Sequence, residues 1–458
     1  MMFEFTFLHL LFIASEILAL LVLLHMLYQR RTPESLIVWL LVIFLLPFVG
    51  VFLYLLIGTR KIGRHKNKRN IELNPIQEAL PEHPTNKLLQ KNNIAGVTDC
   101  NSFELIPEDV DAYNAVMVSL SQAKRSIHIS TYVYENDVTG ESVSALLSKK
   151  SLEGVNVYLL LDTMGSLPVY LWQRSLKKMR ESGVKVEFFQ SGLLRPVKNR
   201  INLRNHRKMF IVDHEVLLSG GMNISDEYMG KDPETKRWRD ILFRSQGPVV
   251  YHYFEVFKAD WEYACDEVLS LPSVDTQKYG ETQIQVVPSG PDLETDALYE
   301  ALLHEMYNAK ERIWIVTPYF VPDSGFMQAL IIARKRGLDV RLITPDKSDH
   351  IIADLGRSAY MRELSESDIA IARFSGGMLH AKAILVDHSM AMIGSANIDY
   401  RSLFLNYELV SLCYSEDVMK EMEQWMEMLM SHSHYRSPDQ GHIRLLLENI
   451  MKIFAPLL

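Results

Sequence analysis

The chain of 458 residues is 48% hydrophobic and has a formal net charge of −8 at pH 7; this length exceeds one ordinary domain, so two domains of similar size are expected. Its three cysteines (Cys100, Cys265 and Cys413) are far apart, which argues against a disulfide framework or a zinc site. The acidic balance argues against a nucleic-acid-binding protein, because such a protein normally has a basic face.

Two apolar runs begin the chain, at residues 5–28 and 36–57, and the second contains no charged residue. Each is long enough to cross a hydrocarbon core of about 30 Å as a helix. We therefore expect residues 1–59 to form a transmembrane or membrane-embedded hairpin of two helices. The alternatives are a buried helix pair in a soluble protein and a shallow hairpin that does not fully cross the bilayer. Glu16, alone within the first run, is either a functional group or a packing residue.

The charge of the chain changes after the second apolar run. Residues 1–70 contain eight Lys or Arg and three Glu, a balance of +5, so the remaining residues carry −13. Six of the basic residues follow the second run: Arg60, Lys61, Arg64, Lys66, Lys68 and Arg69. By the positive-inside rule we expect this end, and the large body after it, in the cytoplasm beside anionic lipid headgroups. Arg30 and Arg31, between the runs, weaken this orientation.

Residues 60–100 are first basic and then polar, contain several prolines and show no sustained period, so we expect a linker. Two halves of similar plan follow, residues 101–275 and 276–458. Matching segments occur in the same order in both: 123–134 with 309–320, 154–162 with 337–345, and 182–189 with 367–374. Alternating strands and helices predict the α/β class, with a mixed β-sheet covered by helices in each half. A pseudo-twofold axis between the halves would bring matching strands to one central cleft.

The strongest repeated pattern is His-x-Lys-x-x-x-x-Asp. It occurs at residues 206–213 and 380–387, each time followed at the same spacing by small residues and an asparagine. The residues are His206, Lys208, Asp213 and Asn223 in the first half, and His380, Lys382, Asp387 and Asn397 in the second. One copy would be a weak signal, whereas two copies with the same downstream spacing indicate a shared function.

The pattern suits chemistry on a phosphodiester. Residues two apart on a strand point to the same face, so each strand presents an imidazole and an ammonium group together. With both strands at one point, one imidazole can act as nucleophile and the other as acid for the leaving oxygen, while cations hold the phosphoryl oxygens. Asn223 and Asn397 can donate further hydrogen bonds to those oxygens. A two-step displacement through phosphohistidine needs no metal or other cofactor. Either histidine alone would more simply be a surface or satisfied residue.

Several other polar residues have candidate supporting roles. Asp213 and Asp387 end apolar strands, which favours a turn-stabilising or orienting role over direct catalysis. Glu408 comes 28 residues after His380, and Asp240 comes 34 residues after His206. On a strand next to its motif, such a carboxylate can hold the histidine in the required tautomer. Surface ion pairs are the alternative.

Residues 195–208 carry six basic side chains in fourteen positions, among them Arg204. As a loop at the mouth of the cleft, this segment can bind anionic headgroups through bidentate arginine contacts. A solvated basic loop is the alternative.

Taken together, these residues resemble the phospholipase D superfamily, and more narrowly its bacterial cardiolipin synthases. The resemblance rests on both His-Lys-Asp motifs, the apolar hairpin ending "YLLIGTR", the segments "PSGPD" (288–292) and "TPYFVPD" (317–323), and the terminal "FAPLL". It implies two phospholipase D-like domains, and a reaction in which two phosphatidylglycerol molecules give cardiolipin and glycerol without a metal. It also implies a multi-pass protein of the bacterial inner membrane.

The resemblance makes His206, Lys208, Asp213, His380, Lys382 and Asp387 the catalytic set. It favours His206 as nucleophile and His380 as acid and base, although the internal symmetry leaves that order open. The rival is a phospholipase D hydrolase, or a phosphatidyltransferase with another alcohol acceptor, since either would share every catalytic residue. A nuclease is disfavoured by the hairpin and the acidic body, and an inactive scaffold by the intact motifs. Headgroup and acyl-chain preference, phosphatidylethanolamine as a donor, and the oligomeric state stay open.

Overall fold

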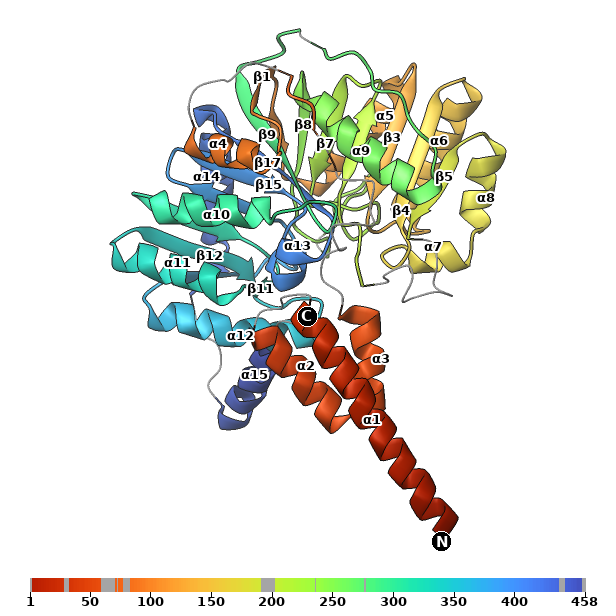
Figure 1. Ribbon diagram of the computed structural model, residues 1–458. Coiled ribbons are helices and arrows are strands. Elements are labelled where there is room, and N and C mark those ends of the chain that lie inside the picture. Colours follow the sequence, from red (N-terminus) through yellow and green to blue (C-terminus); the bar gives the residue numbers. More distant parts are fainter. Residues whose placement is uncertain are drawn as a thin grey trace.

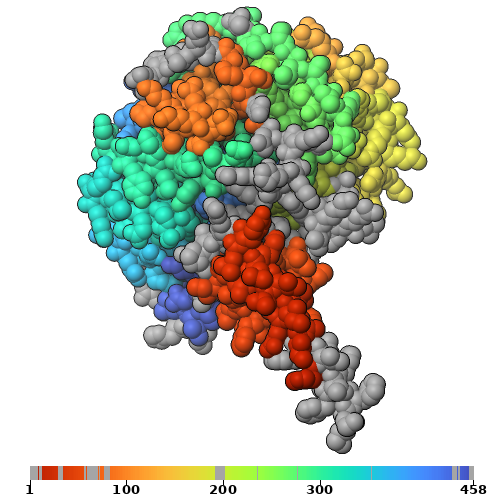
Figure 2. All heavy atoms as spheres, in the orientation of Figure 1, coloured from red at the N-terminus to blue at the C-terminus, as the bar shows by residue number. Residues whose placement is uncertain are grey.

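The computed structural model describes residues 2–28, 33–58, 71, 73–76, 83–190, 202–234, 236–275, 277–435 and 441–454. Two α/β halves lie side by side, and the N-terminal helices project from them in one direction (Figures 1 and 2). The basic cluster after the second apolar run, the arginines between the runs and most of the basic segment before residue 202 lie outside the described residues.

The apolar runs form three helices: α1 (Met2–Tyr28), α2 (Pro33–Leu45) and α3 (Pro47–Ile57). The expectation of one helix in the second run is wrong, because the helix breaks at Leu46, before Pro47. Proline has no amide hydrogen and its ring clashes with the preceding turn. Within the described residues, no helix combines the length and the apolar character that spanning a bilayer requires, so the predicted transmembrane hairpin is not confirmed.

The three N-terminal helices pack on one another through a small core. Trp39 and Tyr54 meet edge to face there with ring centroids 5.2 Å apart, and the Tyr54 hydroxyl lies 2.7 Å from Nδ1 of His25. The outer faces remain apolar and exposed, as at Leu21 and Phe44. Glu16 is also exposed.

Part of the predicted linker is ordered, which corrects the expectation of an irregular segment. Helix α4 (Pro84–Lys91) packs on helix α10 (Ala297–Asn308), where the Thr85 side chain contacts His304 and Glu305. Strand β1 (Thr98–Asn101) joins the sheet of the second half by pairing antiparallel with β9. The chain therefore contacts its second half before it forms the first.

Each half contains a mixed sheet, as predicted. The first has the order β2-β8-β7-β6-β3-β4-β5, with bounds Glu104–Ile106, Leu242–Gln246, Val216–Gly220, Met209–Val212, Ser126–Thr131, Asn156–Asp162 and Lys185–Phe189. The second has the order β1-β9-β17-β15-β14-β10-β12-β13-β18, with bounds after β1 of Thr282–Ser289, Glu408–Cys413, Met390–Gly394, Ala383–Val386, Arg312–Val316, Asp339–Pro345, Ala370–Phe374 and Ser433–His434. A small parallel pair joins β11 (Phe320–Val321) to β16 (Ile398–Asp399).

The repeat is visible in the strand order. The run β8-β7-β6-β3-β4-β5 of the first sheet corresponds to β17-β15-β14-β10-β12-β13 of the second. In both, the last three strands are parallel and the first three antiparallel, so the motif strands β6 and β14 occupy the same position. The two halves thus share one fold.

Helices cover the sheets (Figure 1). Those of the first half are α5 (Asp109–Gln122), α6 (Val138–Leu152), α7 (Leu167–Leu171), α8 (Arg174–Glu181) and α9 (Val249–Cys265). Those of the second, after α10, are α11 (Ser324–Lys335), α12 (Ile351–Glu366), α13 (Tyr400–Phe404), α14 (Glu416–Ser431) and α15 (His442–Phe454). Helix α9 packs against both β5 and β9, so one hydrophobic core continues from the first half into the second. The halves therefore pack together at their junction.

Candidate active site

The two repeated motifs meet at the junction between the halves. In each motif the histidine and lysine lie in the segment just before the strand, β6 or β14, rather than within it as predicted. The His206 amide donates to the carbonyl oxygen of Tyr407 (2.8 Å), and the His380 amide donates to that of Arg239 (2.7 Å). Each histidine is thus fixed by backbone of the opposite half.

The carboxylate partners also cross between the halves. Nδ1 of His206 lies 2.9 Å from Oε2 of Glu408, and Nδ1 of His380 lies 2.7 Å from Oδ2 of Asp240. The expected pairing of each carboxylate with the motif of its own half is therefore wrong. The reason is the backbone contact described above, because Glu408 follows Tyr407 and Asp240 follows Arg239. A partner at Nδ1 leaves Nε2 to face a substrate.

Both lysines are buried beside the histidines. Nζ of Lys208 donates to the carbonyl oxygen of His206 (2.9 Å), while Nζ of Lys382 lies 2.6 Å from Nδ1 and 3.1 Å from Nε2 of His380. Burial lowers the pKa of Lys208 to about 7 and the pKa of Lys382 to about 8. The charge of Lys382 also lowers the pKa of Lys208, and each lysine lowers the pKa of the histidine in the other motif.

Burial sets the protonation of the remaining groups. It lowers the pKa of His206, and it lowers the pKa of His380 to about 3, so both imidazoles are neutral near pH 7. Burial opposes ionisation of Asp240 and Glu408, but the neighbouring cationic and imidazole groups outweigh it and hold the pKa of each carboxyl below its usual range. The site therefore holds two neutral imidazoles, each oriented by a carboxylate.

Aromatic rings pack against both histidines, and sequence reasoning missed them. The Tyr132 ring packs edge to face on His206 at 4.9 Å, and Nζ of Lys208 lies 5.6 Å from its centroid. The rings of Tyr228 and Trp238 each lie 5.2 Å from that of His380. Tyr132 directly follows β3, which pairs with the motif strand β6. This position next to the motif strand could have identified Tyr132 from the sequence.

The two asparagines differ. Oδ1 of Asn223 accepts from the amide of Val133 (3.1 Å) and from the Thr131 hydroxyl (3.3 Å). Its Nδ2 is buried and has no hydrogen-bond partner among the described residues. In Asn397 it is Oδ1 that is buried without such a partner. The Asn223 amide group also lies within hydrogen-bonding range of the Tyr228 hydroxyl, and its role as a donor to phosphoryl oxygens stays a prediction.

The motif aspartates face away from this chemistry. The Asp213 carboxylate accepts hydrogen bonds from the backbone amides of Lys124 (2.8 Å), Arg125 (2.6 Å) and Ser126 (2.8 Å). Asp387 accepts in the same way from Lys310, Glu311 and Arg312 at 2.8 to 2.9 Å. Both aspartates have positive φ angles, 55° and 49°, at the turn after the motif strand. These contacts tie each turn to the start of the neighbouring strand, β3 or β10, and the turn-stabilising or orienting role stays a prediction.

Asp213→Asn and Asp387→Asn are therefore expected to lower stability while turnover of the folded enzyme stays within a few-fold. The loss should be about 1–3 kcal/mol, because one acceptor oxygen becomes an amide donor that faces backbone N–H groups. Urea unfolding of the solubilised variants measures the first effect, and specific activity per folded molecule measures the second. Unchanged stability with abolished turnover would instead place these carboxylates in the reaction.

The two buried arginines before β6 hold the junction together. Arg204 pairs with Asp162 (3.3 Å) and also donates to Gln190 Oε1 (3.1 Å), so its charge is matched by a carboxylate. Arg207 is fully buried. Its guanidinium pairs with Asp260 (2.6 Å) of the first half and Asp292 (2.9 Å) of the second. The segment that carries His206 is thus anchored to both halves.

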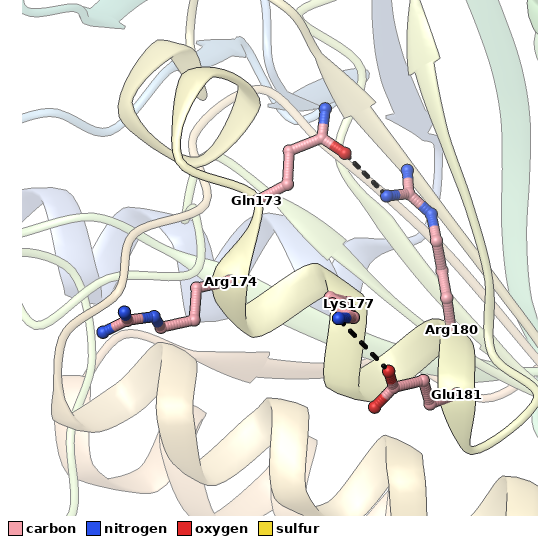
Figure 3. Close-up of a pocket in the computed structure, with 5 residues that line it drawn as sticks. All are labelled: Gln173, Arg174, Lys177, Arg180 and Glu181. Carbon is pink, nitrogen blue, oxygen red and sulfur yellow. Dashed lines mark hydrogen bonds and ion pairs between the residues drawn. The ribbon is translucent and has the colours of Figure 1, made fainter.

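An open hollow on α8 lies outside this site (Figure 3). Its polar side chains pair with one another: Nη1 of Arg180 donates to Gln173 (2.8 Å), and Lys177 lies 3.8 Å from Glu181. None of the residues that line it belongs to the motifs. This hollow is therefore a solvated face of α8.

Comparisons with known proteins identify the family. The family described as "Cardiolipin synthase, PLD-like domain" matches residues 116–261 and 302–430, and the family described as "Phospholipase_D-nuclease N-terminal" matches residues 17–58. Cardiolipin synthase 1 of Bacillus anthracis is 33% identical over 94% of this chain and 90% of its own length. The major cardiolipin synthase of Bacillus subtilis (strain 168) is 33% identical over 91% of this chain and 90% of its own length.

Among solved structures, the phosphatidylserine synthase of Haemophilus influenzae Rd KW20 is similar, with a TM-score of 0.63 and 14% identity. It covers 82% of this chain and all of that one, which supports the fold alone. The sequence relatives span nearly the whole chain, and the family match includes both motif strands. The chain therefore belongs to the phospholipase D-like cardiolipin synthase family.

Proposed function

We propose that the protein transfers a phosphatidyl group from one phosphatidylglycerol to another, giving cardiolipin and glycerol. The observation that carries this is the pair of neutral histidines at one junction, each oriented by a carboxylate of the opposite half and accompanied by a lysine. Membership of the cardiolipin synthase family supports the choice of lipid substrates. Hydrolysis, or transfer to another alcohol, is the alternative outcome at the same site.

In the first step, Nε2 of His206 attacks the phosphorus of the donor. The P–N bond forms and the P–O bond to glycerol breaks. His380, which would take up a proton at Nε2 when the anionic donor binds, gives that proton to the departing oxygen. The described residues give Nε2 of His206 no hydrogen-bond partner, whereas Lys382 lies 3.1 Å from Nε2 of His380. This difference supports His206 as nucleophile. The arriving phosphodiester anion favours proton uptake by His380, because it adds negative charge at a buried site.

In the second step, His380 takes the proton from a glycerol hydroxyl of the acceptor phosphatidylglycerol. That oxygen attacks phosphorus, the P–N bond breaks, and His206 returns to its neutral form. Lys208, Lys382 and Nδ2 of Asn223 would hold the phosphoryl oxygens through both steps. Because one phosphodiester replaces another, water is the competing nucleophile and the buried site limits its access.

The rate should depend on pH through the lysines. Since burial lowers the pKa of Lys208 to about 7 and of Lys382 to about 8, their positive charges are lost as pH rises through this range. We expect kcat/KM for phosphatidylglycerol to fall between about pH 7 and 9. Initial rates in detergent micelles of fixed composition across that range measure it. A kcat/KM that keeps rising to pH 9 would contradict this role of the lysines.

Product analysis tests the proposed function. The purified, detergent-solubilised protein is incubated with phosphatidylglycerol and a chelator, and the lipid and water-soluble products are identified. Cardiolipin with an equal amount of glycerol supports a transferase that needs no added metal. Phosphatidic acid alone would show that water is the acceptor, and the hydrolase would replace the synthase.

We further infer that α1–α3 hold the body at the bilayer, with residues 101–275 and 276–458 as two catalytic domains on the cytoplasmic side of a bacterial inner membrane. Exposed apolar side chains cover the outer faces of these helices, for example Leu20, Leu21, Phe48 and Phe52, and such a surface is typical of membrane contact. The basic residues after the second run support the orientation.

The orientation predicts that protease added to intact cells, or to spheroplasts with a sealed inner membrane, leaves the body uncut. The same protease should digest the body after lysis, because its loops then become accessible. Immunoblotting with an antibody against the C-terminal half measures both. Digestion without lysis would place the body on the outer side.

A further inference from the structure

Arg401 lies in α13, four residues after Asn397, and its guanidinium has only neutral partners. Nη1 donates to Oδ1 of Asn202 (2.7 Å), and Nη2 donates to the carbonyl oxygen of Asn202 (2.6 Å) and to Oδ1 of Asn406 (3.4 Å). Among the described residues, no carboxylate forms an ion pair with Arg401 within 4.0 Å. Asp399, two residues earlier, instead accepts a hydrogen bond from the amide of Ser402 (2.7 Å).

This arrangement distinguishes the half-buried Arg401 from Arg204 and Arg207, the buried arginines of the junction. Arg207 has two carboxylates and Arg204 has one. Burial lowers the pKa of Arg401, and the more distant Asp399 only partly opposes this shift. A half-buried cation without a close counter-charge loses part of its hydration and gains no ion pair in return, while its exposed part stays open to a ligand.

The position of Arg401 connects it to the reaction. Tyr132 packs on His206 and near Lys208, and it lies within electrostatic range of both Arg401 and Arg204. Arg401 also binds Asn202, four residues before His206, across the junction between the halves. Its charge is therefore beside the segment that carries the proposed nucleophile, and outside the motifs themselves.

The proposed reaction needs such a charge. The acceptor lipid brings a second phosphodiester, separated from its attacking hydroxyl by the glycerol carbons. The motif lysines face the phosphoryl group in transfer, so a second anion needs a separate cation nearby. Resting on the proposed function, we propose that Arg401 binds the phosphodiester of the acceptor lipid. A guanidinium suits this role, because its planar array of donors matches phosphate oxygens.

The test compares two acceptors with the same donor. Phosphatidylglycerol is the donor throughout, and the acceptor is either a second phosphatidylglycerol or ethanol, which has no phosphate. In Arg401→Gln we expect cardiolipin formation to fall by about 10- to 100-fold, as for loss of a charge-assisted contact. Phosphatidylethanol formation should stay within about three-fold of wild type. Arg401→Lys, which keeps the charge, should restore part of the cardiolipin activity.

A structural role predicts a different result. If Arg401 only tethers Asn202, then Arg401→Gln lowers cardiolipin and phosphatidylethanol together, and this outcome would overturn the proposal. Asn202→Ala is the matched control, since it removes the Oδ1 contact and keeps the guanidinium; the ratio of the two products should not change. If wild type forms phosphatidylethanol but no cardiolipin, the proposed function fails instead, independently of Arg401.

Discussion

Replacing His206 with Ala is expected to lower kcat/KM for cardiolipin formation by about 10⁴-fold or more, because no nucleophile remains to form the phosphatidyl-enzyme. Replacing His380 with Ala removes the acid and base, which costs about 10²- to 10⁴-fold. Both losses are measured as cardiolipin and glycerol formed from phosphatidylglycerol. Substantial activity in either variant would refute the two-histidine mechanism.

A donor with a good leaving group separates the two roles. Phosphatidyl-4-nitrophenol releases nitrophenolate without needing a proton from the enzyme. His380→Ala should therefore retain a stoichiometric burst of nitrophenolate, and His206→Ala should show none. A burst in His206→Ala but not in His380→Ala would reverse the assignment of nucleophile and acid. Since Glu408 and Asp240 lose their partners in these variants, thermal unfolding must show that each is folded before its rate is compared.

Much of this site is predictable from the sequence, because two copies of the motif with the same downstream spacing rarely arise by chance. The strand order around β6 and β14 repeats as the matched segments imply. The turn position of Asp213 and Asp387 also follows from the sequence, since each aspartate ends an apolar strand. The amides that they contact, at residues 124–126 and 310–312, are distant in sequence and could not be predicted from it.

The errors concern contacts between the halves. Spacing along the chain suggested a carboxylate for each histidine from its own half, yet backbone pairing at Tyr407 and Arg239 directs each to the other half. No periodicity encodes that contact. The sequence also could not show that Arg401 lacks a carboxylate partner, because its contact with Asn202 joins residues that are distant in sequence. The helix break at Leu46, by contrast, was predictable from a local rule, because Pro47 follows it.

The crossed carboxylates give the second large effect. Asp240→Asn is expected to slow cardiolipin formation by about 10²- to 10⁴-fold while leaving the nitrophenolate burst largely intact, although Asp240 belongs to the half that contains His206. Burial lowers the pKa of His380 and the Asp240 charge opposes this, so removing that charge lowers the pKa further, leaves less of the protonated acid and weakens the base. Glu408→Gln should slow the burst itself, because the amide no longer favours the imidazolium character that His206 acquires as it attacks.

The two outcomes distinguish crossed from uncrossed pairing in one experiment. With uncrossed pairs, Asp240→Asn would remove the burst and Glu408→Gln would spare it, the reverse of the expected result. Because both carboxylates are fully buried and each substitution is isosteric, packing changes little and the contrast reports on charge and tautomer. Ser395, whose hydroxyl donates to Oε2 of Glu408 (2.5 Å), supplies the control. Ser395→Ala keeps the Glu408 charge and should therefore slow the burst far less than Glu408→Gln does.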